Sequence, residues 1–286
     1  MGIPNVALPV SRRLELVIEG GPRPRLGQAL RELWSFRHTV LAFAERDVRV
    51  KYKQTVLGVL WAVLQPLAFM VVFTVAFGRF AKVPGGGAPY PAFSLSALVP
   101  WTFLQTAVTF GANALLMDSA IIRKVYLPRE VPVLGAVAHA AVDLVIGVGL
   151  FAVLAPMIGA RFSMTWLLVP ALAVPLALLA AAVALPLAAL NVYYRDFRYA
   201  LPFALQLWLF VSPVVYPLSV VPAQWRSLYV AANPAAGILD AFRSVLALGT
   251  TPDAGLLAAS LAGTALLLWV GYRLFKSLEP GFADLV

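Results

Sequence analysis

The sequence predicts an all-α protein that crosses a membrane several times. Of its 286 residues, 61% are hydrophobic and only 12% are charged, and the mean hydropathy is +0.85. One water-soluble core could not bury that much apolar surface, so lipid is the expected solvent. Several uncharged runs also reach the roughly 20 residues that a helix needs to cross about 30 Å of hydrocarbon. We therefore expect six transmembrane helices, an N-terminal amphipathic interface helix and a re-entrant hairpin.

Composition also excludes several kinds of chemistry. The chain has no cysteine, so a disulfide framework or a thiolate metal or redox site is excluded, and its two histidines are too few for a histidine cluster. We predict no catalytic residue and no metal site. Residues 1–29 carry charged side chains and no apolar core, so they do not have the pattern of a cleavable signal peptide. They are expected to form a cytoplasmic lead.

The transmembrane domain is expected to cover residues 56–286. Its expected spans are residues 56–77, 92–117, 131–155, 166–192, 199–217 and 254–272. Between the last two spans, the longest uncharged piece of residues 218–251 is residues 227–239, which is too short to cross and contains Pro234. This region is therefore predicted to be a re-entrant or interfacial hairpin between spans five and six.

Positive charges orient the spans. Seventeen of the 22 lysines and arginines precede residue 56, follow residue 272, or lie between spans two and three or four and five. Cytoplasmic loops carry such an excess. Both termini are therefore predicted to be cytoplasmic.

Residues 30–55 have the pattern of an amphipathic helix lying in the membrane interface. Polar and apolar residues alternate at helical spacing, and the segment ends in the cations Arg46, Arg49, Lys51 and Lys53. One interpretation is an anchor whose cations reach lipid phosphates. The other is a docking surface for a cytoplasmic partner or for a lipid-linked pyrophosphate. The two interpretations are compatible.

Seven stretches of the chain, which follow one another in a familiar order, are residues 46–67, 77–84, 89–91, 98–103, 121–134, 191–197 and 212–243. Through these stretches, and from about residue 30 onward, the chain resembles the permease subunits of ABC-2 type polysaccharide and polyol phosphate exporters. The resemblance implies a multi-pass protein of the bacterial cytoplasmic membrane that exports a lipid-linked polysaccharide such as O-antigen, capsule or a teichoic acid-like polymer. It also implies a homodimer enclosing a channel, joined by two nucleotide-binding ABC ATPase subunits.

The sequence agrees with the expectation that a separate subunit binds ATP. It contains no Gly-Lys dipeptide, so it has no phosphate-binding loop of the GxxxxGK[ST] type. ATP and Mg are expected on the partner subunit, and this chain is expected to be a transporter subunit with no enzyme activity, cofactor or nucleic acid partner. The alternatives are an ABC-2 drug or small-lipid exporter, a proton-coupled carrier and a membrane glycosyltransferase.

Two cytoplasmic segments are candidate contacts. By resemblance, the first couples to the ATPase, with apolar residues giving contact area and charges setting orientation. Its residues are Ile122, Arg123, Lys124, Val125, Tyr126, Leu127, Pro128, Arg129 and Glu130. The second is a further cytoplasmic contact or part of the substrate entrance, or else a helix end closed by an Arg195–Asp196 ion pair. Its residues are Asn191, Tyr193, Tyr194, Arg195 and Asp196.

Aromatic residues in and near the spans are candidate channel-lining residues, because ring faces can stack on sugars in many registers. The candidates are Trp61, Phe69, Phe73, Trp101, Phe103, Trp208, Phe210 and Tyr216. The alternative is that they face lipid or pack between helices.

His139 and Asp143 are ionisable residues one turn apart, deep in the third span. They predict either a hydrogen-bonded packing pair or a proton relay.

Overall fold

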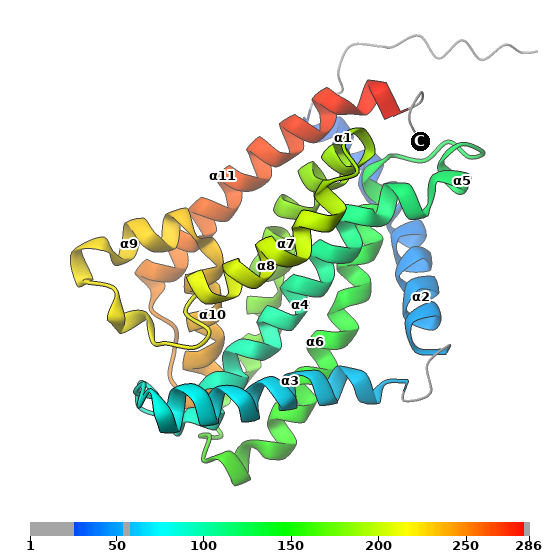
Figure 1. The fold of residues 1–286 in the computed structure, drawn as a ribbon. Coiled ribbons are helices and arrows are strands. Elements are labelled where there is room, and N and C mark those ends of the chain that lie inside the picture. The colour runs from blue at the N-terminus through cyan, green and yellow to red at the C-terminus, as the bar shows by residue number, and fades with distance from the viewer. Residues whose placement is uncertain (1–25, 54–57, 283–286) are drawn as a thin grey trace, which may run out of the picture.

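The computed structural model describes residues 26–53 and 58–282, and every regular element in these ranges is helical (Figure 1). Within these ranges, five helical stretches are long and apolar enough to cross a membrane. They are α3 with its π-helical continuation (Leu60–Phe80), α4 (Tyr90–Met117), α6 (Glu130–Ile158), η2 with α7 (Met164–Tyr193) and α11 with η5 (Ala254–Gly281). They match five of the six expected spans. Residues 1–25, and position 56 where the first expected span begins, lie outside the described residues.

The remaining expected span, residues 199–217, coincides with a shorter helix. α8 (Phe197–Val211) has 15 residues, a length of about 22 Å at 1.5 Å per residue. Ser212 then takes an extended conformation, and an irregular segment leads to η3 (Leu218–Val220). Because about 30 Å of hydrocarbon must be crossed, length alone does not identify α8 as a span.

The expected hairpin region contains two short helices and a π-helical turn. These are α9 (Ala223–Ala232), α10 (Pro234–Arg243) and η4 (Ser244–Leu248). Asn233 breaks the helix between α9 and α10, and Pro234 occupies the first turn of α10, where its missing N–H has no helical partner to lose. Both helices pack against α11 (Figure 1).

The segment expected to form the interface helix contains two helices, α1 (Leu26–Ser35) and α2 (Arg37–Lys53). α2 packs against α6 and buries Phe43 and Ala44. Gly135 of α6 permits this close approach, because a Cβ atom there would lie 2.7 Å from the Cβ of Phe43. In Figure 1, α1, the short helix α5 (Ser119–Ile122) and the C-terminal end of α11 gather at one end of the bundle.

α4 is the central helix of the bundle and packs against both α6 and α7. Of its most apolar stretch, 72% is buried, against 11% of the corresponding stretch of Leu60–Phe80. Small residues bring the central helices close together, as is usual for helices packed in membranes. A Cβ atom on Gly111 of α4, for example, would lie 2.7 Å from that of Ala184 in α7.

Two glycines of α6 provide a test of this packing. A Cβ atom on Gly147 would lie 2.9 Å from Val99 Cγ1 of α4, whereas one on Gly149 would meet nothing within 4 Å. We expect Gly147→Leu to lower the thermal stability of the purified protein, because overpacking a tight contact costs about 1–3 kcal/mol. Gly149→Leu is the matched control and should leave the melting temperature nearly unchanged. Equal losses in the two variants would contradict the packing of α6 on α4.

Candidate functional site

The loop between α4 and α6 is folded back on itself. The carbonyl oxygen of Asp118 accepts from the amides of Ile121 and Ile122, both at 3.0 Å, which starts the short helix α5. Arg129 Nη1 donates to the carbonyl of Ile122 at 2.9 Å and closes the loop. We refer to residues 118–130 as the cytoplasmic loop, after the side of the membrane on which the sequence predicts it. Its fixed shape makes its tip a defined surface.

The residues of this loop divide into a tip and an inner side. Val125 is 58% exposed and Tyr126 is 72% exposed, whereas Ile122 and Leu127 are buried. Leu127 packs with Phe43 of α2. The exposed apolar side chains at the loop tip are therefore those of Val125 and Tyr126. The expectation that Ile122 and Leu127 offer contact area is corrected, because both side chains hold the loop against the bundle.

Glu130 also has an internal role. It is 2% exposed, and its Oε1 lies 2.5 Å from Lys276 Nζ of α11. The Tyr272 hydroxyl donates to the same oxygen at 3.1 Å, and Lys276 in turn contacts Glu279 at 2.9 Å. The expected direct contact of Glu130 with a partner is thus corrected, because this carboxylate ties the end of the loop to α11.

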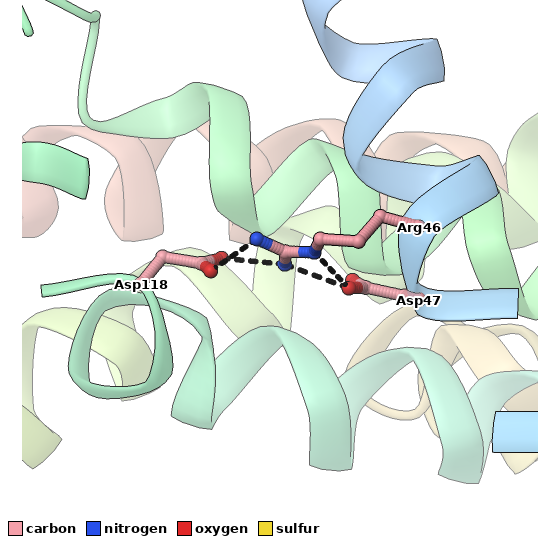
Figure 2. Close-up of polar contacts among 3 residues, drawn as sticks. All are labelled: Arg46, Asp47 and Asp118. Carbon is pink, nitrogen blue, oxygen red and sulfur yellow. Dashed lines mark hydrogen bonds and ion pairs between the residues drawn. The ribbon is translucent and has the colours of Figure 1, made fainter. Parts of the chain in front are cut away.

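Arg46 of α2 lies between two carboxylates (Figure 2). Its Nη1 and Nη2 donate to the two oxygens of Asp118 at 2.5 and 3.0 Å, and its Nε and Nη2 donate to Asp47 Oδ1 at 2.8 and 2.7 Å. The Asp118 side chain is buried and that of Arg46 is half-buried. The hydrogen bonds that Arg46 donates to Asp118 raise the pKa of Arg46 above its ordinary value. Arg46 therefore joins α2 to the start of the cytoplasmic loop.

A second charged contact lies near the C-terminal end of α2. Lys51 Nζ is 2.5 Å from Asp143 Oδ2 of α6, and the Tyr52 hydroxyl donates to the other oxygen of Asp143. His139 is fully buried beside the Phe110 ring, and neither of its ring nitrogens has a hydrogen-bond partner among the described residues. The expected His139–Asp143 hydrogen bond is therefore wrong, and the geometry supplies no relay between the two side chains.

These contacts change the interpretation of the four cations at the end of the interface helix. Arg46 is held by Asp118 of the cytoplasmic loop, and Lys51 is held by Asp143 of α6. Arg49 is exposed and pairs with the exposed Glu45 at 2.5 Å, and Lys53 is exposed. Arg49 and Lys53 are consequently the two cations of this set that are presented at the surface.

The second cytoplasmic segment is likewise partly internal. Asn191 is 1% exposed, and its Nδ2 donates to the Ala112 carbonyl at 3.0 Å and to Asn113 Oδ1 at 3.1 Å, which joins α7 to α4. Tyr193 donates to the Leu278 carbonyl at 2.8 Å. The expectation of a partner contact at Asn191 is corrected, and Tyr193 ties α7 to the end of α11.

Tyr194, Arg195 and Asp196 are the exposed part of this segment. No ion pair joins Arg195 to Asp196 within the ranges that the structure describes. The helix-end ion pair considered as an alternative is therefore not formed. These three side chains are the ones that a partner or substrate could reach.

Several aromatic residues expected to line a channel lie in the core of the single chain. Trp101 and Phe103 are each 1% exposed, and Phe73 is also buried. Trp101 meets Trp208 edge to face at 5.6 Å, and Trp208 Nε1 donates to Asn233 Oδ1 at 2.9 Å. The expectation is corrected for Trp101, Phe103 and Phe73, whose rings are enclosed by neighbouring helices.

The remaining channel candidates reach the surface to differing degrees. Trp61 and Phe210 are exposed, whereas Phe69, Trp208 and Tyr216 are partly buried. Phe210 belongs to a larger apolar face of α8 that includes Tyr199, Phe203 and Leu207. Sequence reasoning missed the other three, although their four-residue spacing is a helical signal.

Arg243 organises the opposite end of the bundle, and sequence reasoning counted it only as a charge. It is 3% exposed, and its guanidinium lies 3.8 Å from the centroid of the Phe93 ring. Its Nη2 donates to the carbonyls of Pro213 and Val214 at 2.6 and 3.3 Å. Arg243 therefore fixes the irregular segment that follows α8.

Several named transport proteins are similar in sequence to this chain over most of its length. The family model for the ABC-2 type transporter matches residues 38–247. The O-antigen export system permease protein RfbA of Myxococcus xanthus is 29% identical over 258 residues, which cover 89% of this chain and 98% of that protein. A Klebsiella pneumoniae protein of the same name is 23% identical over 86% of this chain and 94% of its own length. The polysialic acid transport protein KpsM of Escherichia coli is 24% identical over 84% and 93%.

Proposed function

We propose, from the premise that this chain belongs to the ABC-2 type transporter family, that it is the channel-forming permease of an ATP-driven polysaccharide exporter. The observation that carries the proposal is the similarity to O-antigen export permeases, which covers 86–89% of this chain and 94–98% of those proteins. The five long apolar helices agree with a multi-pass protein of the cytoplasmic membrane. The proposed cargo is a lipid-linked polysaccharide.

Removing the gene from its native bacterium tests this proposal. The surface polysaccharide should disappear while the lipid-linked polymer accumulates in the cytoplasm, and a plasmid copy should restore the surface polymer. Unchanged surface polysaccharide would refute the proposal.

Energy is proposed to enter through a separate ATPase subunit that binds ATP and Mg. The absence of a phosphate-binding loop from the sequence supports this division. The tip of the cytoplasmic loop suits such a partner, since the apolar side chains of Val125 and Tyr126 project beside the exposed cations Arg123 and Lys124. Apolar contact would supply affinity, and the cations would set orientation.

Two copies of the chain are proposed to enclose the channel. Support comes from two helices with exposed apolar side chains. α3 leaves Trp61, Leu64 and Val71 exposed, and α8 exposes the apolar face that contains Phe203 and Phe210. Such surfaces can meet lipid, a second copy or the polymer. The proposed assembly is a homodimer bound to two ATPase subunits.

The proposed topology has six crossings and two cytoplasmic termini. Five crossings are the long apolar helices, and α8 would be the fifth in chain order, completed by the irregular segment that Arg243 holds. The helices α9 and α10 would form the re-entrant hairpin at the outer surface. The distribution of lysine and arginine supports this orientation.

The exposed cations Arg49 and Lys53 are proposed to hold the pyrophosphate of the lipid carrier, because phosphate accepts charge-assisted hydrogen bonds. Replacing both with glutamine should lower polymer export about tenfold, while membrane insertion and binding of the ATPase stay unchanged. Export is measured as surface polysaccharide per cell. The matched control replaces the exposed Arg31 and Arg37, at the other end of the same helix pair, with glutamine. Equal export by both variants would exclude the assigned role.

A further inference from the structure

The interface helices and the cytoplasmic loop contact each other at three separate points. Arg46 binds Asp118 where the loop begins. Phe43 packs against Leu127 after the loop tip. The Tyr126 hydroxyl donates to Glu32 of α1 at 3.1 Å. The two segments therefore share an interface, and of its three contacts only that of Tyr126 belongs to the loop tip assigned to the ATPase.

The Arg46–Asp118 contact is the strongest of the three. It is bidentate and charge-assisted, and it joins residues 72 positions apart in the chain. The backbone carbonyl of Asp118 accepts the first hydrogen bonds of α5. Its side chain accepts the hydrogen bonds from Arg46 of α2. Any shift of α5 must therefore move or break the bond to Arg46.

Beneath this contact, α2 is not continuously packed. A cavity of about 250 Å³ lies between α2, α4 and α6, lined by Arg46, Lys51 and Asp118 together with apolar residues such as Phe110 and Met117. Side chains beside a void lose packing contacts on that side. Around the cavity, α2 is held to the bundle by two charged contacts, Arg46 with Asp118 and Lys51 with Asp143.

The two contacts hold α2 to different parts of the molecule. Lys51 fixes the C-terminal end of α2 to α6, within a helix of the bundle. Arg46 fixes the middle of α2 to the cytoplasmic loop, at the junction with α5. The loop contacts α2 directly through Arg46 and through the packing of Leu127 on Phe43, and movement of the loop can reach α2 by these contacts.

We infer that Arg46 is a positioning residue that transmits movement of the cytoplasmic loop to the interface helix. The inference rests on the proposed function, in which the ATPase displaces that loop. When the loop moves, Asp118 draws Arg46 and hence α2 with it. Loss of the Arg46–Asp118 bond should leave ATP hydrolysis intact but uncouple it from transport.

Charge reversal in the purified complex of this chain with its ATPase tests the inference. We expect Arg46→Glu and Asp118→Arg each to lower the polymer moved per ATP hydrolysed by about tenfold, with hydrolysis changed less than about twofold. The double variant Arg46→Glu/Asp118→Arg restores an opposite-charge pair. It should recover most of the polymer moved per ATP hydrolysed. Arg37→Glu is the control, since it makes the same change at an exposed position of the same helix. The inference would be overturned if Arg46→Glu moved as much polymer per ATP as the parent. It would also be overturned if the double variant moved no more polymer per ATP than the single variants.

Asp118→Asn separates this role from phosphate binding by Arg46. It keeps the shape of the side chain but removes the charge that engages Arg46. If Arg46 served only to bind the phosphate of the substrate, releasing it would maintain or raise transport. The inference requires polymer per ATP to fall.

Hydrogen exchange supplies a readout that does not depend on transport. In the parent complex, nucleotide should change the protection of both residues 119–125 and residues 37–53. In Arg46→Glu, the change should persist in the loop and disappear from α2. Continued response of α2 would contradict the inference. Failure of the parent complex to transport polymer would instead count against the proposed function.

Discussion

Val125→Asp is expected to abolish stable binding of the ATPase subunit. Val125 lies at the tip of the cytoplasmic loop and is 58% exposed, so the substitution should not disturb the bundle. In the assembled transporter it would place a carboxylate in an apolar contact, and such a buried, unpaired charge is costly. Loss of a hot-spot residue at the centre of an interface costs about 2 kcal/mol or more, so affinity should fall by at least about thirtyfold. Co-purification of the ATPase with the tagged permease measures the effect.

The matched control is Val220→Asp, which makes the same change at an exposed valine of η3 (64% exposed). That position lies in the outer hairpin region of the proposed topology, so ATPase binding should be retained. Tyr126→Ala should weaken binding as well, because it removes the most exposed aromatic ring of the tip. If Val125→Asp and Val220→Asp retain the ATPase equally, the loop tip is not the docking surface.

Arg243→Leu is expected to destabilise the protein more than any other single change at the end of the bundle where α10 lies. The substitution leaves the carbonyls of Pro213 and Val214 without their buried donor. Each buried group left unpaired costs about 1–3 kcal/mol. The lost cation–π contact with Phe93 adds to this. The melting temperature should therefore fall by about 5–10 °C, and export should fall with it.

Arg226→Leu provides the comparison. Arg226 also donates to backbone carbonyls, those of Val221 at 2.8 Å and Ser219 at 3.1 Å, but it is partly exposed. Water can replace its hydrogen bonds, so its loss should lower the melting temperature by only about a degree. Comparable losses for the two arginines would show that burial of Arg243 does not determine its importance.

The sequence predicted most of the helices because apolarity is a local property. The length and apolarity of an uncharged run predict a membrane-spanning helix, whichever helices pack around it. α8 shows where that signal fails: the apolar run continues to residue 217, whereas the helix ends at Val211. The segment after it is buried by α10 and held by Arg243, and hydropathy does not distinguish such a segment from helix.

The candidate site was less predictable because its contacts join distant positions. Arg46 and Lys51 have the pattern of free interfacial cations, but their partners Asp118 and Asp143 lie 72 and 92 residues away. Conversely, His139 lies one turn from Asp143 in sequence, yet the carboxylate binds the charged Lys51. The sequence identified Trp101 as a large aromatic residue, but only the central position of α4 determines that its ring is enclosed.

ATP-dependent polymer movement in sealed vesicles tests the proposed function most directly. Inside-out vesicles would contain this chain with its ATPase, and uptake of lipid-linked polysaccharide would be measured with and without ATP and with the proton gradient collapsed. The expected result is uptake that requires both ATP and the ATPase and is unaffected by loss of the gradient. Uptake by this chain alone, driven by a proton gradient without ATP, would contradict the account.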